Sequence, residues 1–343
     1  MNSKEIITAA ARRQKTPRVP VSLLSGGAWT FNRQGLSLEK TLNCGAELAA
    51  EILAETNQEV GCDVVWPASG YHNLAIKALG GNIKWRKKGT PDVLEPLINE
   101  AREVEAIDLA TMQEDKDLNT LWDTARVLVK NIGDHTMVGA SQWGPFTLAG
   151  LIYGVERLMR NIYKDKESVH RVLSFTSELC YQYLASFIEA GVGILSVADP
   201  NSSGDLISRQ QFAEFSVPYL QQVVSKIKAR GVIPFIHICG NITNRLDLIP
   251  ATGVEILSLD YKVPLAKAGE ILGSQIAFAG NMNPVAVMQN AKAEEVARIC
   301  TECIKAAGNS SYILMPGCDI PPAVPIENIK AMVNTARSYQ LEV

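Results

Sequence analysis

The sequence predicts an α/β protein, a single (β/α)8 TIM barrel over residues 1–343 with an N-terminal helix over residues 1–17. Short, nearly continuous Val/Ile/Leu-rich runs alternate with amphipathic stretches, as is typical of parallel strands covered by helices. Eight such runs are present, and eight strand–helix units close a barrel. The predicted strands are residues 18–24, 62–66, 135–141, 194–199, 232–239, 255–260, 275–280 and 312–317.

The segments between these strands have helical periodicity. The first residues, MNSKEIITAAARRQ, form an amphipathic pattern whose basic residues come late. Further helices are predicted around residues 38–55 and over 166–190, 208–229 and 293–307. An open, doubly wound sheet is the competing architecture, but no G-x-G-x-x-G motif follows an early strand, which disfavours a dinucleotide-binding sheet.

Composition excludes several classes of function. The chain is 47% hydrophobic and 20% charged, with 33 basic and 36 acidic side chains and a net charge of −3. This balance argues against a nucleic-acid partner, which calls for a basic surface. Apolar runs fall short of the roughly 20 residues of a membrane span, and the amino terminus lacks an apolar signal core. We expect a cytoplasmic protein without a membrane role.

Cysteine usage points to free thiols or a metal site. Seven cysteines are scattered along the chain, an odd number that does not suggest a disulfide framework. Cys300 and Cys303 form a C-x-x-C pair, but the surrounding helical pattern has no second ligand pair, so we interpret both as helix-face residues.

The sharpest chemical signal is the pattern His237-Ile238-Cys239. Residues i and i+2 of a strand point to the same face, so His237 and Cys239 should project together. Cys318 follows a different predicted strand. One imidazole and two thiolates suit zinc, and three protein ligands leave one coordination position open, as in catalytic zinc sites. The alternative is a core histidine with two buried thiols, but the position at strand ends favours a metal.

Other polar residues also lie near predicted strand ends, where barrel enzymes carry their chemistry. These are Gln142, Asp199, Asp260 and Asn281. His72 follows another strand and could line a pocket. A basic run, Lys84 to Lys88 around Trp85, could touch an anionic partner, although such runs are usually solvated surface.

The carboxy-terminal half resembles the uroporphyrinogen decarboxylase superfamily, and more narrowly its zinc-dependent branch, the methylcobamide:coenzyme M methyltransferases. The resemblance covers nearly the whole chain in length and element order, and is most specific over residues 140–340. The matching motifs are GPFTLA (144–149), ADP (198–200), GDLIS (204–208), HICGN (237–241), AGN (279–281) and PGCDIPP (316–322).

This resemblance implies a methyltransferase with zinc on His237, Cys239 and Cys318. An incoming thiol would bind zinc as a thiolate and take a methyl group from methylcobamide carried on a partner corrinoid protein. Asp260 would be a fourth ligand or a carboxylate behind the ligands, with a helix N-cap as the alternative. Gln142, Asp199 and Asn281 would shape the pocket by hydrogen bonding. The acceptor thiol, the methyl donor and the direction of transfer stay open.

The sequence departs from the decarboxylases themselves. Residues 24–32 contain no arginine and residues 64–69 no carboxylate, whereas a tetrapyrrole with many carboxylates calls for arginines. Porphyrinogen decarboxylation is therefore not expected. Two alternatives remain: methyl transfer from a methoxy compound or methylamine to a corrinoid protein, with zinc as Lewis acid, and a non-catalytic partner of a corrinoid protein.

Overall fold

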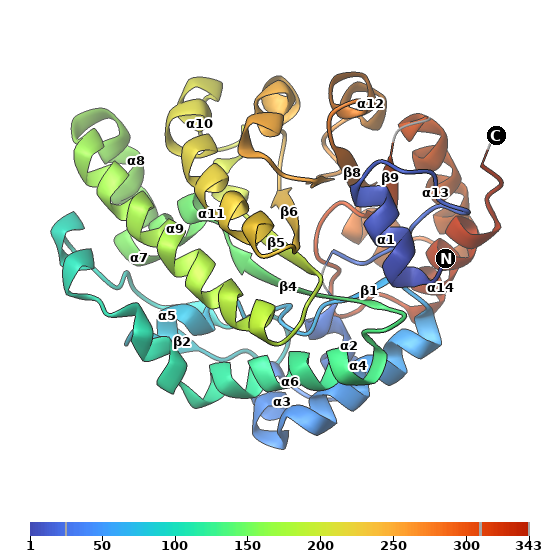
Figure 1. The fold of residues 1–343 in the computed structure, drawn as a ribbon, viewed down its shortest axis with the longest axis horizontal. Helices are drawn as coiled ribbons and strands as arrows, with labels where there is room; N and C mark the ends of the chain where they lie inside the picture. The colour runs from blue at the N-terminus through green and yellow to red at the C-terminus, as the bar shows by residue number, and fades with distance from the viewer. Residues whose placement is uncertain (25, 309–310, 342–343) are drawn as a thin grey trace.

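Seven parallel strands form one curved sheet in the order β1–β4–β5–β6–β7–β8–β9 (Figure 1). The structure, a computed structural model, describes residues 1–24, 26–308 and 311–341. The strands are β1 (Val64–Val65), β4 (Met137–Trp143), β5 (Ile194–Ala198), β6 (Ile233–Ile238), β7 (Ile256–Leu259), β8 (Ala277–Met282) and β9 (Tyr312–Pro316).

The segment around Val21 lies between the two edge strands of this sheet. Val21 forms a parallel bridge with Leu314 of β9, and its carbonyl accepts a hydrogen bond of 2.8 Å from the N–H of Asp63, next to β1. The predicted first strand is thus present as a single bridge, since Pro20 has no N–H to donate to a longer ladder. Together with the sheet it completes the circuit of a barrel, which confirms the predicted fold class.

Helices surround the strands (Figure 1). Most predicted helices are present, but two are divided: the first at Gly45, and the second at Ser216, two residues before Pro218. The connection between β6 and β7 is a 3₁₀ segment, η4 (Thr243–Thr252). The helices are α1 (Ser3–Ala11), α2 (Gly27–Arg33), α3 (Leu38–Cys44), α4 (Ala46–Val60), α5 (Leu74–Ala78), α6 (Lys116–Ile132), α7 (Pro145–Tyr153), α8 (Val155–Lys164), α9 (Lys166–Glu189), α10 (Arg209–Phe215), α11 (Val217–Ala229), α12 (Leu265–Leu272), α13 (Ala293–Ala307) and α14 (Ile326–Ser338), with shorter turns η1 (Ala101–Ala106), η2 (Leu109–Glu114), η3 (Pro200–Ser202) and η5 (Pro284–Gln289).

The strands carry two separate apolar layers because successive side chains alternate in direction. Residues of one parity pack outward against the helices, and those of the other parity form a second cluster inside the barrel. Ile7, Ala10 and Ala11 of α1 belong to the inner cluster, and the N–H of Lys4 bonds the carbonyl of His135 just before β4. Helix α1 therefore covers the amino ends of the strands.

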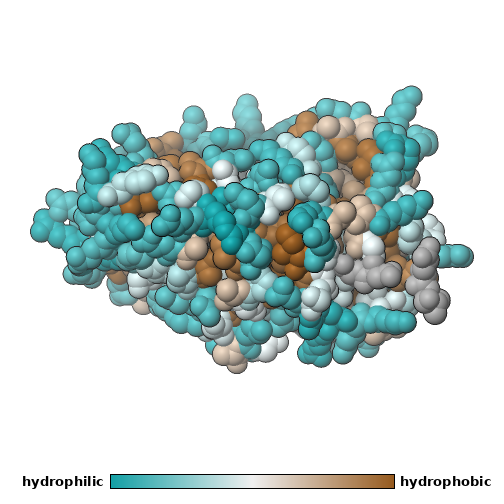
Figure 2. All heavy atoms as spheres, turned by 90° about the horizontal axis from the view of Figure 1, so that it is seen from above, coloured by the Kyte–Doolittle hydropathy of each residue, from teal (hydrophilic) through white to brown (hydrophobic). Residues whose placement is uncertain are grey.

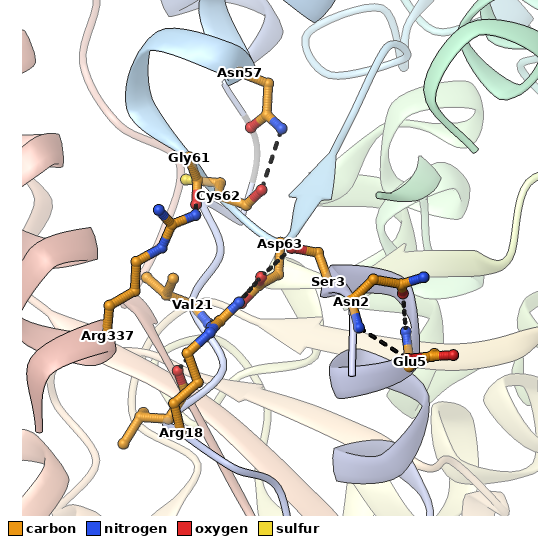
Figure 3. Close-up of polar contacts among 11 residues, drawn as sticks. Asn2, Ser3, Glu5, Arg18, Val21, Asn57, Gly61, Cys62, Asp63 and Arg337 are labelled. Carbon is orange, nitrogen blue, oxygen red and sulfur yellow. Dashed lines mark hydrogen bonds and ion pairs between the residues drawn. The ribbon is translucent and has the colours of Figure 1, made fainter. Parts of the chain in front are cut away.

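A buried carboxylate, Asp63, holds this end of the barrel together (Figure 3). Its side chain is inaccessible to solvent and pairs with Arg18 at 2.5 Å. It also accepts hydrogen bonds from the Ser3 hydroxyl at 2.5 Å and from the Val21 N–H at 2.9 Å. One carboxylate thus joins helix α1, the bridging segment and the start of β1.

A two-stranded antiparallel hairpin, β2 (Ile83–Lys84) and β3 (Asp92–Val93), is inserted between β1 and β4. The side of the molecule in Figure 2 is largely hydrophilic with separate apolar patches, as expected for the solvent side of amphipathic helices. Within the described residues, no helix combines the length and the apolar character that crossing a bilayer requires.

Candidate metal centre

His237, Cys239 and Cys318 converge at the carboxyl ends of β6 and β9. His237 has the parity of Ile233 and Phe235, which lie in the inner cluster, so its ring faces the barrel interior. Its Nε2 lies 2.8 Å from Cys239 Sγ, which lies 2.9 Å from Cys318 Sγ. Among the described residues, this is the only group of three or more His, Cys, Asp or Glu side chains close enough to share a metal ion.

The imidazole of His237 is held in place by the neighbouring strand. Ser258 of β7 is paired with His237 in the sheet, and its hydroxyl lies 2.9 Å from His237 Nδ1. A proton on Nδ1 that is donated to this hydroxyl leaves the lone pair of Nε2 directed at the two thiols. Such a partner behind a histidine ligand fixes both tautomer and ring orientation.

Two glycines allow the loops that carry the cysteines to pack closely against neighbouring loops. A Cβ on Gly317 would lie 2.6 Å from the backbone nitrogen of Tyr261, so the residue before Cys318 must lack a side chain. Gly240, directly after Cys239, has φ +95° and a Cβ there would lie 2.7 Å from Asp205 Oδ2.

The two thiols are electrostatically coupled. The hydrogen bond from Cys239 and the neighbouring His237 lower the pKa of Cys318, against the opposing effect of burial. The same hydrogen bond raises the pKa of Cys239, as do burial and the nearby Asp260 and Asp319 carboxylates. The lowered pKa favours the thiolate form of Cys318. A divalent cation bound here would lower the pKa of Cys239, so that both cysteines could be thiolates together.

This donor set fits zinc. One imidazole nitrogen and two thiolate sulfurs are typical zinc ligands, and the third protein ligand leaves a fourth position for water or substrate. Both cysteines are partly accessible while His237 is buried. A metal held here would be reached from the carboxyl ends of the strands.

Asp260 lies beside the three-residue cluster, not in it. Its Oδ2 accepts a 3.0 Å hydrogen bond from the N–H of Gly240, and its Oδ1 accepts one of 2.8 Å from the N–H of Lys262. Asn281 supports the same loop, because its Nδ2 donates to the carbonyl of Asp260 at 3.0 Å and to that of Val263. Of the roles expected for Asp260, which were a fourth ligand, a carboxylate behind the ligands or a helix N-cap, these contacts favour a carboxylate that positions the backbone next to Cys239.

Asp199 and Gln142 lie elsewhere than the sequence analysis expected. Both have the strand parity that faces the helices, and both are fully buried. Asp199 accepts hydrogen bonds from the N–H groups of Phe146 and Thr147 at the start of α7, and from the hydroxyls of Thr147 and Ser202. Gln142 Oε1 accepts from the N–H of Trp143. Neither side chain faces the mouth of the barrel.

His72, which the sequence suggested only as a possible pocket residue, forms an aromatic wall with Trp143 at the end of β4. The ring of His72 stacks on Trp143 at 4.3 Å, and its Nε2 lies 2.8 Å from the Ser141 hydroxyl. Trp143 Nε1 donates to Asn73 Oδ1 at 2.8 Å. In the sheet register Trp143 is aligned with Ala198, which is aligned with His237. The wall and the metal site thus stand at the same height, two strands apart.

Burial lowers the pKa of His72 to about 4, so its imidazole is neutral at neutral pH. Its Nδ1 is buried without a hydrogen-bond partner among the described residues. Only the strand-exit position of His72 could have been noticed from sequence, because its partners are about seventy residues away.

Comparisons with known proteins identify the family of the chain. Residues 2–339 match the uroporphyrinogen decarboxylase (URO-D) family, and the chain belongs to it. The methylcobamide:CoM methyltransferase MtbA of Methanosarcina acetivorans is 26% identical over 98% of both chains. A uroporphyrinogen decarboxylase of Syntrophotalea carbinolica is 30% identical over 84% of this chain and 83% of its own.

A solved structure has the same fold. It is described as a methyltransferase from Methanosarcina mazei, covers 98% of both chains and superposes with a TM-score of 0.89 at 23% identity. The fold class and the superfamily predicted from sequence are confirmed. So is the predicted enzyme class, a methyltransferase.

Proposed function

We propose that this enzyme moves a methyl group between a methylcobamide carried on a corrinoid protein and a small thiol. The observation that carries the proposal is the convergence of His237, Cys239 and Cys318 at the barrel mouth. Similarity to relatives named as methylcobamide:CoM methyltransferases supports it over most of the chain. The residues that would bind the many carboxylates of a porphyrinogen are absent from the first two strand ends.

Zinc bound at this site would lower the pKa of the acceptor thiol and present its sulfur as a nucleophile. The protein's part is to hold three ligands with one position free. Ser258 orients the imidazole, and Asp260 and Asn281 fix the backbone that carries Cys239. The sulfur–carbon bond forms as the cobalt–carbon bond breaks, the electron pair stays on cobalt, and the thiol proton is lost.

Cys239 and Cys318 are partly accessible at the strand ends, so a small thiol would reach the ligand cluster there while a bulky carrier would stay outside. The stacked His72–Trp143 pair gives the mouth a flat aromatic wall at the end of β4. Because the imidazole of His72 is neutral, this wall excludes water without placing a charge next to the methyl group being transferred.

The first experiment measures zinc in the purified protein and in the variants Cys318→Ser and Cys44→Ser. We expect about one zinc per chain in the wild type and in Cys44→Ser, since Cys44 is exposed and remote from the cluster. Cys318→Ser should lose most of its zinc. Folded wild-type protein that takes up no zinc on reconstitution would overturn the mechanism.

Turnover distinguishes the possible reactions. Zinc-loaded enzyme is mixed with free methylcobalamin and a panel of thiols that includes 2-mercaptoethanesulfonate and homocysteine, and demethylation is followed by absorbance. Turnover with one of these thiols supports the proposal. Methylation of reduced cobalamin by a methoxy compound or a methylamine, without any thiol, would assign the opposite half-reaction. Binding of a corrinoid protein without turnover in either assay would indicate a non-catalytic partner.

A further inference from the structure

The hairpin between β1 and β4 concentrates positive charge on an otherwise acidic chain. Residues 82–95 carry four basic and two acidic side chains, a net charge of +2, whereas the whole chain carries −3. Lys84, Arg86, Lys87 and Lys88 are all exposed. Leu94, at the base of the hairpin, is 60% exposed and adds an apolar spot to the same element.

Most of this positive charge is not neutralised within the chain. Arg86 pairs with Asp92 at 2.5 Å across the hairpin. Lys84, Lys87 and Lys88 have no ion-pair partner among the described residues, whereas Arg171, Arg209, Lys226 and Arg230 are each paired with a carboxylate. Three unpaired ammonium groups within five residues are available to an external anionic surface.

Hydrogen bonds connect the hairpin to the mouth of the barrel. The carbonyl of Pro91, beside β3, accepts a 2.8 Å hydrogen bond from Asn73 Nδ2. The same Asn73 side chain accepts from Trp143 Nε1, and Trp143 stacks on His72. Asn32, near the end of α2, accepts from the N–H of Gly89 in the hairpin turn at 3.1 Å. These bonds tie the basic turn to the loop after β1 and to α2, and through Asn73 to the aromatic wall at the end of β4.

We propose that the hairpin, residues 83–93, is the docking arm for an acidic face of the corrinoid-carrying protein. This inference rests on the proposed function, which requires a macromolecular methyl carrier to approach the mouth. Rim charges of one sign steer an oppositely charged partner and raise the association rate, and salt weakens them. The rigid base places these charges next to the wall, so a carrier that binds the turn has its cofactor close to the mouth.

A protein partner fits this surface better than a nucleic acid. The patch is small, with three unpaired lysines at the end of β2 and in the turn that follows it, whereas a nucleic acid calls for a longer basic stripe. Leu94, exposed beside the charges, suits an interface with an apolar spot inside a polar rim.

The test uses the triple variant Lys84→Glu, Lys87→Glu and Lys88→Glu, which leaves the Arg86–Asp92 pair intact. Binding of a corrinoid protein from the same organism, loaded with methylcobalamin, is measured by calorimetry, and methyl transfer by absorbance. At low salt we expect the Kd and the KM for the carrier to rise about tenfold or more. The kcat/KM for free methylcobalamin and the zinc content should not change.

The matched control reverses three exposed lysines at the opposite end of the barrel, Lys15, Lys130 and Lys305. Lys130 and Lys305 lie near the ends of the helices before β4 and β9, Lys15 precedes the bridging segment around Val21, and none has an ion-pair partner among the described residues. This variant has the same net charge as the hairpin variant. Its affinity for the carrier should stay close to that of the wild type.

Salt titration provides a readout that needs no variant. Carrier affinity of the wild type should fall as KCl rises, and that of the hairpin variant should respond much less. Equal carrier affinity in the wild type and the hairpin variant, or wild-type affinity that salt does not change, would overturn the inference. So would tight binding of a single-stranded RNA oligonucleotide that depends on the three lysines. A failure of the proposed function would give a different result, because the enzyme would then not turn over free methylcobalamin with any thiol.

Discussion

At the scale of single residues, the metal site depends on side chains behind the ligands as much as on the ligands. Ser258 reaches His237 from the next strand, and Asp260 reaches the backbone of Gly240 from the following loop. Each contact restricts one ligand to one direction. Such partners typically change metal affinity 10- to 100-fold when they are removed.

Replacing Ser258 by alanine tests this support directly. We expect zinc affinity to fall about tenfold or more, because the ring of His237 loses its fixed orientation. Competition with a chromophoric chelator measures the affinity. Ser196→Ala is the matched control, since Ser196 is buried at an inward position on β5, in register with Phe235 and not with His237. Equal loss of affinity in both variants would show that any change inside the barrel weakens the site.

The buried imidazole of His72 should make stability depend on pH. Burial lowers its pKa from 6.5 to about 4, so the unfolded chain binds the extra proton first as the pH falls. The contribution of the neutral His72 ring to the free energy of unfolding is fully present above about pH 6.5 and is lost progressively towards pH 4. At pH 5 the free energy of unfolding is lower by about 2 kcal/mol.

Urea unfolding at pH 7 and pH 5 checks this expectation. In His72→Gln, the difference in the free energy of unfolding between pH 7 and pH 5 should be smaller than in the wild type by about 2 kcal/mol. In His135→Gln, which changes an exposed histidine, it should match the wild type. A pH dependence that is the same with and without His72 would contradict a neutral buried ring.

Residue-level prediction succeeded where neighbours along the chain determine the geometry. His237 and Cys239 share a face because they are two residues apart in and just after a strand, and this spacing is visible in the sequence. Gln142 and Asp199 were expected to face the mouth because they lie near predicted strand ends. Strand β4 in fact continues two residues beyond its predicted end. The alternation of side chains along a strand, and not closeness to its end, decides which face a residue takes. The partners of His72 lie on another strand, which no local pattern reveals.

At the scale of elements, the segment predicted as the first strand has few backbone hydrogen bonds to neighbouring strands and is held by side-chain contacts as well. The segment around Val21 has one bridge to β9, and Asp63 supplies further contacts to its backbone and to Arg18. A side-chain anchor thus compensates for a short ladder. The sequence predicted the strand from its apolar residues, but Pro20 limited its backbone pairing.

Asp63→Asn should therefore destabilise the whole protein. The change removes a buried charge that pairs with Arg18, and breaking such a pair costs about 3 kcal/mol. Thermal unfolding measures the loss as a lower Tm. Asp247→Asn is the comparison, because Asp247 also pairs with an arginine but is 56% exposed, so its Tm should change far less. Equal shifts in both variants would contradict a special role for Asp63.

At the scale of the whole molecule, the barrel could be predicted because its strands and helices alternate so regularly along the chain. The divided helices and the 3₁₀ connection after β6 could not, since short breaks leave the average periodicity unchanged. The hairpin was visible only as a basic run. Its position at the rim depends on Asn73 and Asn32, whose partners are fixed by the fold.

Helix α1, which covers the amino ends of the strands, has a kinetic consequence. Because Ile7, Ala10 and Ala11 fill the amino end of the barrel, the thiol and the carrier must share one entrance. With the proposed function, this imposes a compulsory order: the thiol enters first, and its methylated form leaves only after the carrier has departed. Excess carrier should then inhibit by closing the entrance of an empty enzyme. Initial rates should fall at high carrier concentration, and added thiol should restore them.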